Sequence, residues 1–219
     1  MVTIETFPNR EEWLKNRRHG IGGSDIAAVI GANPFMSNID LWEIKTGKKE
    51  QADISENPRV AYGTQAEKYL RGLFELDHPE YEVFYSEYNS VRNDRYPWAL
   101  ASLDGTTREI ATGRKGVLEI KTTEIMSASD WDKWKDRIPQ NYFCQVLYYM
   151  AVTESEYADL RAAIKFTSAE GDKRITIRDY HIEIADVEDD MNYLMFEGEH
   201  FWDCVEKKIC PARILPDIG

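Results

Sequence analysis

Three residues with side chains suited to metal binding and proton transfer stand close together near the middle of the chain. Glu119 and Lys121 are separated by one residue, and Asp104 lies fifteen residues before Glu119. In a strand, alternate side chains share a face, so Glu119 and Lys121 would point the same way while their apolar neighbours point into a core. This arrangement predicts a metal site beside an amine that can orient water.

The residues between Asp104 and Glu119 indicate how the two carboxylates could meet. Asp104 follows the apolar run 98–101 and precedes a glycine, which indicates a turn. The segment 106–115 is rich in Thr, charge and Gly, as is typical of a connection between paired strands. If this connection folds back on itself, it brings Asp104 beside Glu119. Two carboxylates with a main-chain carbonyl between them suit Mg²⁺ or Mn²⁺.

A Glu-x-Lys pair by itself is also typical of a solvated strand face, because 30% of the chain is charged. The apolar residues on either side favour a largely buried strand instead. Charges are rarely fully buried unless they are paired or bound to a metal.

Two further polar residues lie in predicted helices. Glu67 belongs to the amphipathic segment 64–76, where position alone favours a solvent-exposed helix glutamate. It becomes a site residue only if this helix packs over the strand pair. Gln145 lies among apolar residues of another helix, so its amide must find buried partners. It is either a structural glutamine or a residue that holds a water or a metal ligand.

The segment from Arg17 to Ser24 is the part of the sequence that most suggests anion binding. Its glycines at 20, 22 and 23 let backbone amides approach a phosphate, and the neighbouring Arg and Ser add donors. We expect Ser24 to be the N-cap of a helix over 25–30. A glycine-rich helix cap without a ligand is the alternative, and the segment lacks the Gly-Lys-Ser/Thr ending of a P-loop.

Hydrophobic periodicity predicts a mixed sheet with helices against it, in an α/β or α+β three-layer domain. We interpret residues 1–219 as a single domain, with 154–219 as its extension. Helices are expected over 11–18, 25–30, 37–46, 64–76, 139–151 and 186–209, and strands over 81–91, 96–103, 116–122, 160–166 and 174–184.

Composition limits the classes of protein that the chain can belong to. The three cysteines show no Cys-x-x-Cys spacing, which argues against zinc and iron–sulfur sites. No apolar run approaches the length of a membrane span, and no secretory signal is visible, so we expect a soluble cytoplasmic protein. The net charge of −12 weakens a nucleic-acid interpretation. However, residues 1–50 are neutral, and residues 151–219 carry eight Lys and Arg against sixteen Asp and Glu.

Taken together, these segments resemble the YqaJ-like viral recombinase nucleases, relatives of bacteriophage lambda exonuclease in the PD-(D/E)XK superfamily. The resemblance runs from about residue 13 to about residue 153. Five short motifs occur in the family order, and the order makes the signal specific although each motif is weak. They are Trp13-Leu14-Lys15-Asn16-Arg17 with Gly22-Gly23-Ser24-Asp25, then Tyr62-Gly63-Thr64-Gln65-Ala66-Glu67, Leu103-Asp104-Gly105, Leu118-Glu119-Ile120-Lys121 and Gln145-Val146.

The resemblance implies a restriction-endonuclease-like core and a role for each matched position. It implies divalent-metal binding by Glu67, Asp104, Glu119 and the main-chain carbonyl of Ile120, water activation by Lys121 with support from Gln145, and 5′-phosphate binding by Arg17 and Ser24.

The activity implied is Mg²⁺-dependent 5′-to-3′ digestion of one strand of linear double-stranded DNA, with Mn²⁺ as a possible substitute and two ions per site. The 3′ single-stranded tails would serve phage-type recombination. The resemblance further implies a homotrimeric ring and a single-strand annealing protein as partner. Two alternatives remain open: an endonuclease with the same core, and a non-catalytic DNA-binding recombination scaffold.

Overall fold

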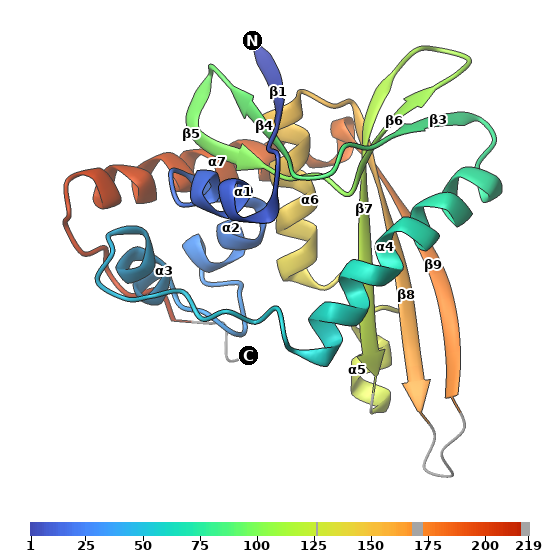
Figure 1. Cartoon of the computed structure of the whole chain (residues 1–219), viewed down its shortest axis with the longest axis horizontal. Coiled ribbons are helices and arrows are strands. Elements are labelled where there is room, and N and C mark those ends of the chain that lie inside the picture. Colours follow the sequence, from blue (N-terminus) through green and yellow to red (C-terminus); the bar gives the residue numbers. More distant parts are fainter. Residues whose placement is uncertain (126, 168–172, 216–219) are drawn as a thin grey trace.

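The computed structural model describes residues 1–125, 127–167 and 173–215, and in this part of the chain it shows two mixed β-sheets flanked by helices (Figure 1). The five-stranded sheet has the order β3-β6-β7-β8-β9, and the four-stranded sheet has the order β1-β4-β5-β2. The elements are β1 (Val2–Thr6), α1 (Arg10–Arg17), β2 (Ile21–Gly22), α2 (Gly23–Val29), α3 (Asn38–Lys45), α4 (Pro58–Asp77), β3 (Tyr81–Phe84), β4 (Asn89–Asn93), β5 (Tyr96–Ala101), β6 (Gly105–Glu109), β7 (Lys115–Ile125), α5 (Ala128–Asp132), α6 (Gln140–Thr153), β8 (Tyr157–Thr167), β9 (Lys173–Glu183) and α7 (Ile184–Glu206).

Strands β7 and β8 form the centre of the five-stranded sheet. They run parallel, whereas the β3–β6, β6–β7 and β8–β9 pairs are antiparallel. A parallel pair needs a crossover connection, and α6 supplies it. This helix is apolar on nearly all sides and is buried from Cys144 to Val152, because it lies between the sheet, α2 and α7 (Figure 1).

The alternation of side chains along β7 divides the core between two helices. Val117 belongs to the large core on the α6 side, whereas Leu118 and Ile120 pack with Leu70 and Phe74 of α4 on the other side. Apolar residues every three to four positions turn one face of α4 toward the sheet. Helix α4 therefore lies across β7 and β8 (Figure 1).

The four-stranded sheet carries the glycine-rich segment near the N-terminus. Its short strand β2 runs parallel to β5, with Ile21 opposite Ala99. A Cβ on Gly20 would lie 2.5 Å from the carbonyl oxygen of Trp98, so this approach requires glycine. The Tyr148 hydroxyl donates to the carbonyl of Ile21 at 2.6 Å and thereby connects the segment to α6.

The mixed α/β fold class is confirmed, but several predicted elements differ. The strand predicted over 81–91 is two strands, β3 and β4, which belong to different sheets. The strand predicted over 96–103 is β5, and it does not pair with β7 as expected. The expected connection 106–115 contains most of β6, which is the antiparallel neighbour of β7. The threonines and charged residues of this segment are compatible with an exposed strand near a sheet edge. The prediction of a connection without a strand was therefore wrong.

Helix boundaries also differ from the sequence-based predictions. Helix α4 begins at Pro58 rather than 64, with the Asn57 side chain as its cap. Proline is well tolerated at the first helical position because it lacks a donor that would have no partner there. Strand β1 was not predicted. In the described part of the chain, no helix has both the length and the apolarity to cross a membrane.

Candidate active site

The site around Asp104 and Glu119 forms where β7 extends beyond its neighbour. Strand β6 pairs with β7 only from Lys115 to Leu118. Just past that point the Asp104 carboxylate takes the place of a strand, because its Oδ2 accepts the Ile120 N–H at 2.9 Å. The N–H and C=O of a strand residue face the same edge, so the Ile120 carbonyl also faces the edge occupied by Asp104.

Glu119 is the most deeply buried carboxylate of this site, with 1% of the residue exposed. Its Oε1 accepts hydrogen bonds from the Lys121 ammonium group and from Gln145 Nε2, the latter at 2.7 Å. Its Oε2 is buried and has no hydrogen-bond partner among the described residues. Buried polar atoms are normally satisfied, so an oxygen with a free lone pair at this position is a candidate ligand atom.

The electrostatics of the site reflect an excess of buried negative charge. Burial, assisted by Asp104, raises the pKa of Glu119 to about 8. Burial also raises the pKa of Asp104, against the opposing effect of Lys121. Burial would lower the pKa of Lys121, but the Glu119 and Asp104 carboxylates outweigh it and raise that pKa. Such shifts are typical of functional sites.

Glu67 joins the same group from α4. Burial and the neighbouring Asp104 carboxylate raise the pKa of Glu67 to about 7, while Lys121 and Arg71 act in the opposite direction. The structure therefore brings Glu67 to Asp104 and Lys121, as the functional interpretation of this glutamate requires. We refer to Glu67, Asp104, Glu119, Lys121 and Gln145 as the carboxylate site.

The donor atoms of the carboxylate site fit a hard divalent cation. Three carboxylates and the Ile120 carbonyl supply oxygen only, and Glu119 Oε2 is unpartnered among the described residues. In those residues, no three Asp, Glu, His or Cys side chains converge as a ready-made ligand sphere. Mg²⁺ does not need one, because it usually binds through one or two carboxylates and keeps several waters.

Arg17 and Ser24 come together beside the glycine-rich segment. The Arg17 guanidinium donates to the Ser24 hydroxyl at 3.3 Å and lies over the Trp13 ring at 4.7 Å. Ser24 is not the N-cap that the sequence predicted, because α2 begins at Gly23 and Gly22 occupies the cap position. The Asp25 carboxylate closes this turn by accepting the Gly22 N–H at 2.9 Å.

Asp25 also holds a buried ion pair with Lys45, at 2.8 Å. Burial would raise the pKa of Asp25, but the Lys45 and Arg17 charges lower it below its usual value. Asp25 therefore stays ionised, and Lys45 also donates to the Arg17 carbonyl at 3.3 Å. These contacts fix the backbone around Arg17 from α3.

Tyr149 connects the two sets of residues and was missed in the sequence. Its hydroxyl accepts a hydrogen bond from Gln145 Nε2 at 3.2 Å. Its ring packs on Gly23, where an added Cβ would lie 2.2 Å from Cε1. Both Glu119 and Arg17 act on the Tyr149 pKa, which burial raises. The spacing of four between Gln145 and Tyr149 places them on one helix face, and this signal could have identified the tyrosine.

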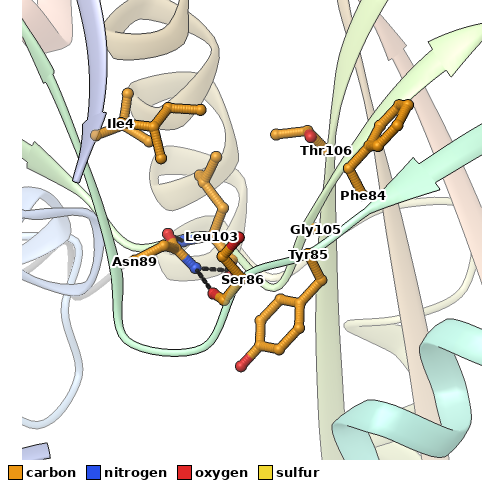
Figure 2. A pocket seen from close by; sticks show the side chains of 9 residues that line it. Ile4, Phe84, Tyr85, Ser86, Asn89, Leu103, Gly105 and Thr106 are labelled. Carbon is orange, nitrogen blue, oxygen red and sulfur yellow. Dashed lines mark hydrogen bonds between the residues drawn. The ribbon is translucent and has the colours of Figure 1, made fainter. Parts of the chain in front are cut away.

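A pocket of about 90 Å³ lies beside the turn that carries Asp104 (Figure 2). It is lined by Leu103 and Gly105, the neighbours of Asp104, and by Ile4, Phe84 and Thr106. The Asn89 side chain also lines the pocket, and its Nδ2 donates a hydrogen bond to the Leu103 carbonyl at 2.8 Å. None of the carboxylates lines it, so the reactive groups lie elsewhere around the Asp104 turn.

Comparisons with known proteins identify the family. Residues 12–156 match the YqaJ-like viral recombinase domain. The chain is 32% identical over 151 residues to the uncharacterised protein YqaJ of Bacillus subtilis, and 28% identical over 158 residues to an uncharacterised protein of Acanthamoeba polyphaga mimivirus. Each match covers 68% of this chain, but 44% and 28% of the two relatives.

Solved structures show the same fold. An alkaline exonuclease from Laribacter hongkongensis matches with a TM-score of 0.65 and 16% identity, over 91% of this chain and 94% of that one. A phage-related exonuclease from Haemophilus somnus matches with a TM-score of 0.54 and 12% identity, over 90% and 99% of the two chains. These neighbours have the restriction-endonuclease-like fold, which confirms the predicted core.

Proposed function

Because the chain belongs to the YqaJ-like viral recombinase family, we propose that it is a Mg²⁺-dependent 5′-to-3′ exonuclease that digests one strand of linear double-stranded DNA. The product would be 3′ single-stranded tails for phage-type recombination. The observation that carries the proposal is the buried Glu119 carboxylate, which keeps Oε2 without a partner among the described residues, beside Asp104 and Lys121.

The metal-binding part of the proposal concerns four residues. Glu67, Asp104, Glu119 and the carbonyl of Ile120 would hold two Mg²⁺ ions, with Mn²⁺ as a substitute. When bound, such ions lower the pKa of water and offset charge on the attacking and leaving oxygens of a phosphodiester. Bound cations would also keep the three carboxylates ionised, against the burial that raises their pKa values.

Lys121 and Gln145 would act on the water and on the Glu119 carboxylate. In the chain alone, the Glu119 and Asp104 carboxylates raise the pKa of Lys121, so its amine is protonated and would orient the attacking water. Bound cations would lower that pKa by repulsion, so that Lys121 would also help to deprotonate the water. Gln145 fixes Oε1 of Glu119 and leaves Oε2 as the atom available to a ligand.

Arg17 and Ser24 would bind the 5′-phosphate of the strand being digested. A guanidinium and a hydroxyl in contact form a donor set that phosphate oxygens accept readily. After each cleavage the new 5′-phosphate can advance into the same place, which gives the digestion its direction. Tyr149, which contacts Gly23 and Gln145, holds this place next to the carboxylate site.

The assembly and the partners belong to the proposal as well. A homotrimeric ring would let duplex DNA enter a channel while an acidic outer surface accounts for the net charge of −12. A single-strand annealing protein would take up the 3′ tail.

The test is digestion of linear duplex DNA with 5′-phosphate or 5′-hydroxyl ends, beside a closed circle, with Mg²⁺ and with chelator. We expect Mg²⁺-dependent loss of the linear 5′-phosphorylated duplex only. Cutting of the circle would identify an endonuclease, and binding without digestion would identify a scaffold.

Arg17→Ala and Arg18→Ala form a matched pair for the phosphate site. Both remove a guanidinium from the same short segment, but Arg18 is exposed and Arg17 alone donates to Ser24. We expect Arg17→Ala to abolish the preference for 5′-phosphate ends and Arg18→Ala to keep it. An unchanged preference in Arg17→Ala would refute the phosphate site without affecting the metal site.

A further inference from the structure

Two of the metal-binding candidates come from structural elements that do not adjoin in sequence. Asp104 stands in the turn before β6, and Glu67 is on α4. The apolar contacts of α4 with the sheet involve Leu70, Phe74 and the partly buried Ala66, and this cluster includes no residue of the Asp104 turn. A polar contact is needed to fix the Asp104 turn relative to α4, because a shift of about 1 Å between catalytic groups can cost two orders of magnitude in rate.

Arg71 makes that contact. It lies four residues after Glu67, so the two side chains share a face of α4. Arg71 Nη1 donates a hydrogen bond to the main-chain carbonyl of Asp104 at 2.8 Å. The Asp104 carboxylate is held separately by the Ile120 N–H. Asp104 is therefore fixed at both ends, by α4 through its carbonyl and by β7 through its carboxylate.

Tyr85 holds Arg71 in place from the other side. The guanidinium carbon lies 3.5 Å from the centroid of the Tyr85 ring, which is a close cation–π contact. Tyr85 belongs to the connection between β3 and β4, and its ring points away from Phe84 and Thr106 (Figure 2). The stacked ring restricts the rotamers of Arg71, so the guanidinium is already ordered when it donates to Asp104.

The charge of Arg71 also acts on the same carboxylates. Burial raises the pKa values of Glu67 and Asp104, and Arg71 opposes this rise at both residues. Tyr85 lies in the same electrostatic environment. Burial raises its pKa, and the charges of Arg71, Glu67 and Asp104 also act on it. Arg71 thus lies among the ligand candidates without supplying an oxygen of its own.

We propose that Arg71, stacked on Tyr85, is a positioning residue that holds the Asp104 turn against α4 and so sets the spacing of the Glu67 and Asp104 carboxylates for divalent cations. The inference rests on the proposed function. Partners that orient metal ligands typically contribute about 10–100-fold to metal affinity when they are tested by mutation.

The experiment measures Mn²⁺ binding by the full chain without DNA, by calorimetry and electron paramagnetic resonance, together with the Mg²⁺ concentration for half-maximal digestion. The variants are Arg71→Met and Arg71→Lys. The control is Arg95→Met, which removes an arginine that stacks on Tyr96 at 5.2 Å in the other sheet. We expect Arg71→Met to weaken Mn²⁺ binding about 10–100-fold, Arg71→Lys to recover part of it, and Arg95→Met to match the native protein.

Tyr85→Leu is the second variant, and it decides the question if Arg71→Met does not fold. It keeps the arginine and its hydrogen bond but removes the stack, so we expect a smaller loss of Mn²⁺ affinity. Native Mn²⁺ affinity in the folded variants would overturn the inference while leaving the proposed function intact. Native Mn²⁺ affinity with weakened DNA binding would show that Arg71 contacts DNA instead. If the native protein neither binds Mn²⁺ nor digests DNA, the proposed function fails and the inference fails with it.

Discussion

Helix α4 covers two charged clusters in which the pKa values of the carboxylates shift in different directions. Toward its first half lies the carboxylate site, where burial raises the pKa of Glu67, Asp104 and Glu119 together. At its far end lies a second cluster, in which Arg161 and two histidines lie between carboxylates. We call this second cluster the histidine network; it comprises Asp77, His78, Glu80, Asp159, Arg161, Asp179, His181 and Glu183.

In the histidine network, the carboxylates face cations. Arg161 is buried and donates to Asp179 through Nε at 2.8 Å and to Asp77 through Nη2 at 2.8 Å. Burial would raise the pKa of Asp179, but Arg161 and His78 outweigh it and lower that pKa. In the carboxylate site, Lys121 and Arg71 do not outweigh burial, and the pKa values of all three carboxylates are raised. In the histidine network, burial raises the pKa of Asp159 in the same way, but the pKa values of Glu80, Asp179 and Glu183 are lowered.

On this difference we base the proposal that the carboxylate site serves function and that the histidine network serves stability. Unpartnered buried atoms occur at both clusters, namely Glu119 Oε2 in one and Asp159 Oδ2 and Arg161 Nη1 in the other. An unpartnered atom alone therefore does not identify a functional site. Burial that raises the pKa values of several neighbouring carboxylates together is the more informative sign.

The strongest test of this comparison exchanges one carboxylate of the carboxylate site for its amide. We expect Glu119→Gln to reduce Mg²⁺-dependent digestion by about a thousandfold or more, because a neutral amide cannot replace an anionic ligand. The melting temperature should stay the same or rise, since one of several mutually repelling carboxylates is removed. Digestion assays and thermal unfolding of the same preparation check both expectations. A large fall in melting temperature with little loss of digestion would reverse the assignment.

The matching change in the histidine network should lower stability and leave digestion nearly unchanged. Asp179→Asn leaves Arg161 buried without its main counter-ion, which we expect to lower the free energy of unfolding by up to about 3 kcal/mol. Digestion at 25 °C should remain close to that of the native protein. Asp203→Asn is the control, because the Asp203–Lys207 pair is exposed and should contribute little. Equal stabilities of the Asp179 and Asp203 variants would contradict the expectation.

A smaller effect is expected at Tyr149, which joins the carboxylate site to Arg17 and Ser24. Tyr149→Phe keeps the ring on Gly23 but removes the hydroxyl that accepts from Gln145. Loss of one such hydrogen bond, about 1 kcal/mol, corresponds to roughly a fivefold lower digestion rate. Tyr193→Phe, on the exposed face of α7, is the control. A Tyr149→Phe rate equal to that of Tyr193→Phe would show that the hydroxyl is dispensable.

The smallest effect concerns the pH dependence of stability. Both ring nitrogens of His78 face carboxylates, Glu80 and Asp179, and both of His181 face Asp159 and Glu183. Only an imidazolium can donate from both nitrogens. Burial would lower the two histidine pKa values, but the carboxylates outweigh it and raise them.

A raised pKa in the folded chain means that the stabilisation is complete below the unfolded value of about 6.5. It is lost as the pH rises through the folded values. We therefore expect a modest fall in melting temperature as the pH rises above about 6.5. The double variant His78→Gln, His181→Gln should lack this part of the pH dependence, and a native-like slope in that variant would contradict the expectation.

Much of the carboxylate site could be predicted from local sequence. The alternation around Glu119 and Lys121 predicts a shared face with Leu118 and Ile120 in a core, and the structure has this arrangement. The turn at Asp104 and its approach to Glu119 were also expected. The predicted strand pairing was wrong, because β7 pairs with β6 on this side and not with the strand over 96–103. Local pattern detects which face a strand buries, but pairing depends on contacts distant in sequence.

The sequence by itself determined which residue types could do chemistry and which of them share a strand or helix face, because those relations follow from backbone periods of 2 and 3.6 residues. Only the tertiary structure decided which of these groups meet. From sequence alone, Glu67 is predicted to be a surface glutamate, and it joins the site only because α4 packs over β7. The role proposed for Arg71 and Tyr85 depends on Arg71 contacting both the Asp104 carbonyl and the Tyr85 ring. The same holds for the excess of buried charge at Glu119, since desolvation depends on the whole packed core.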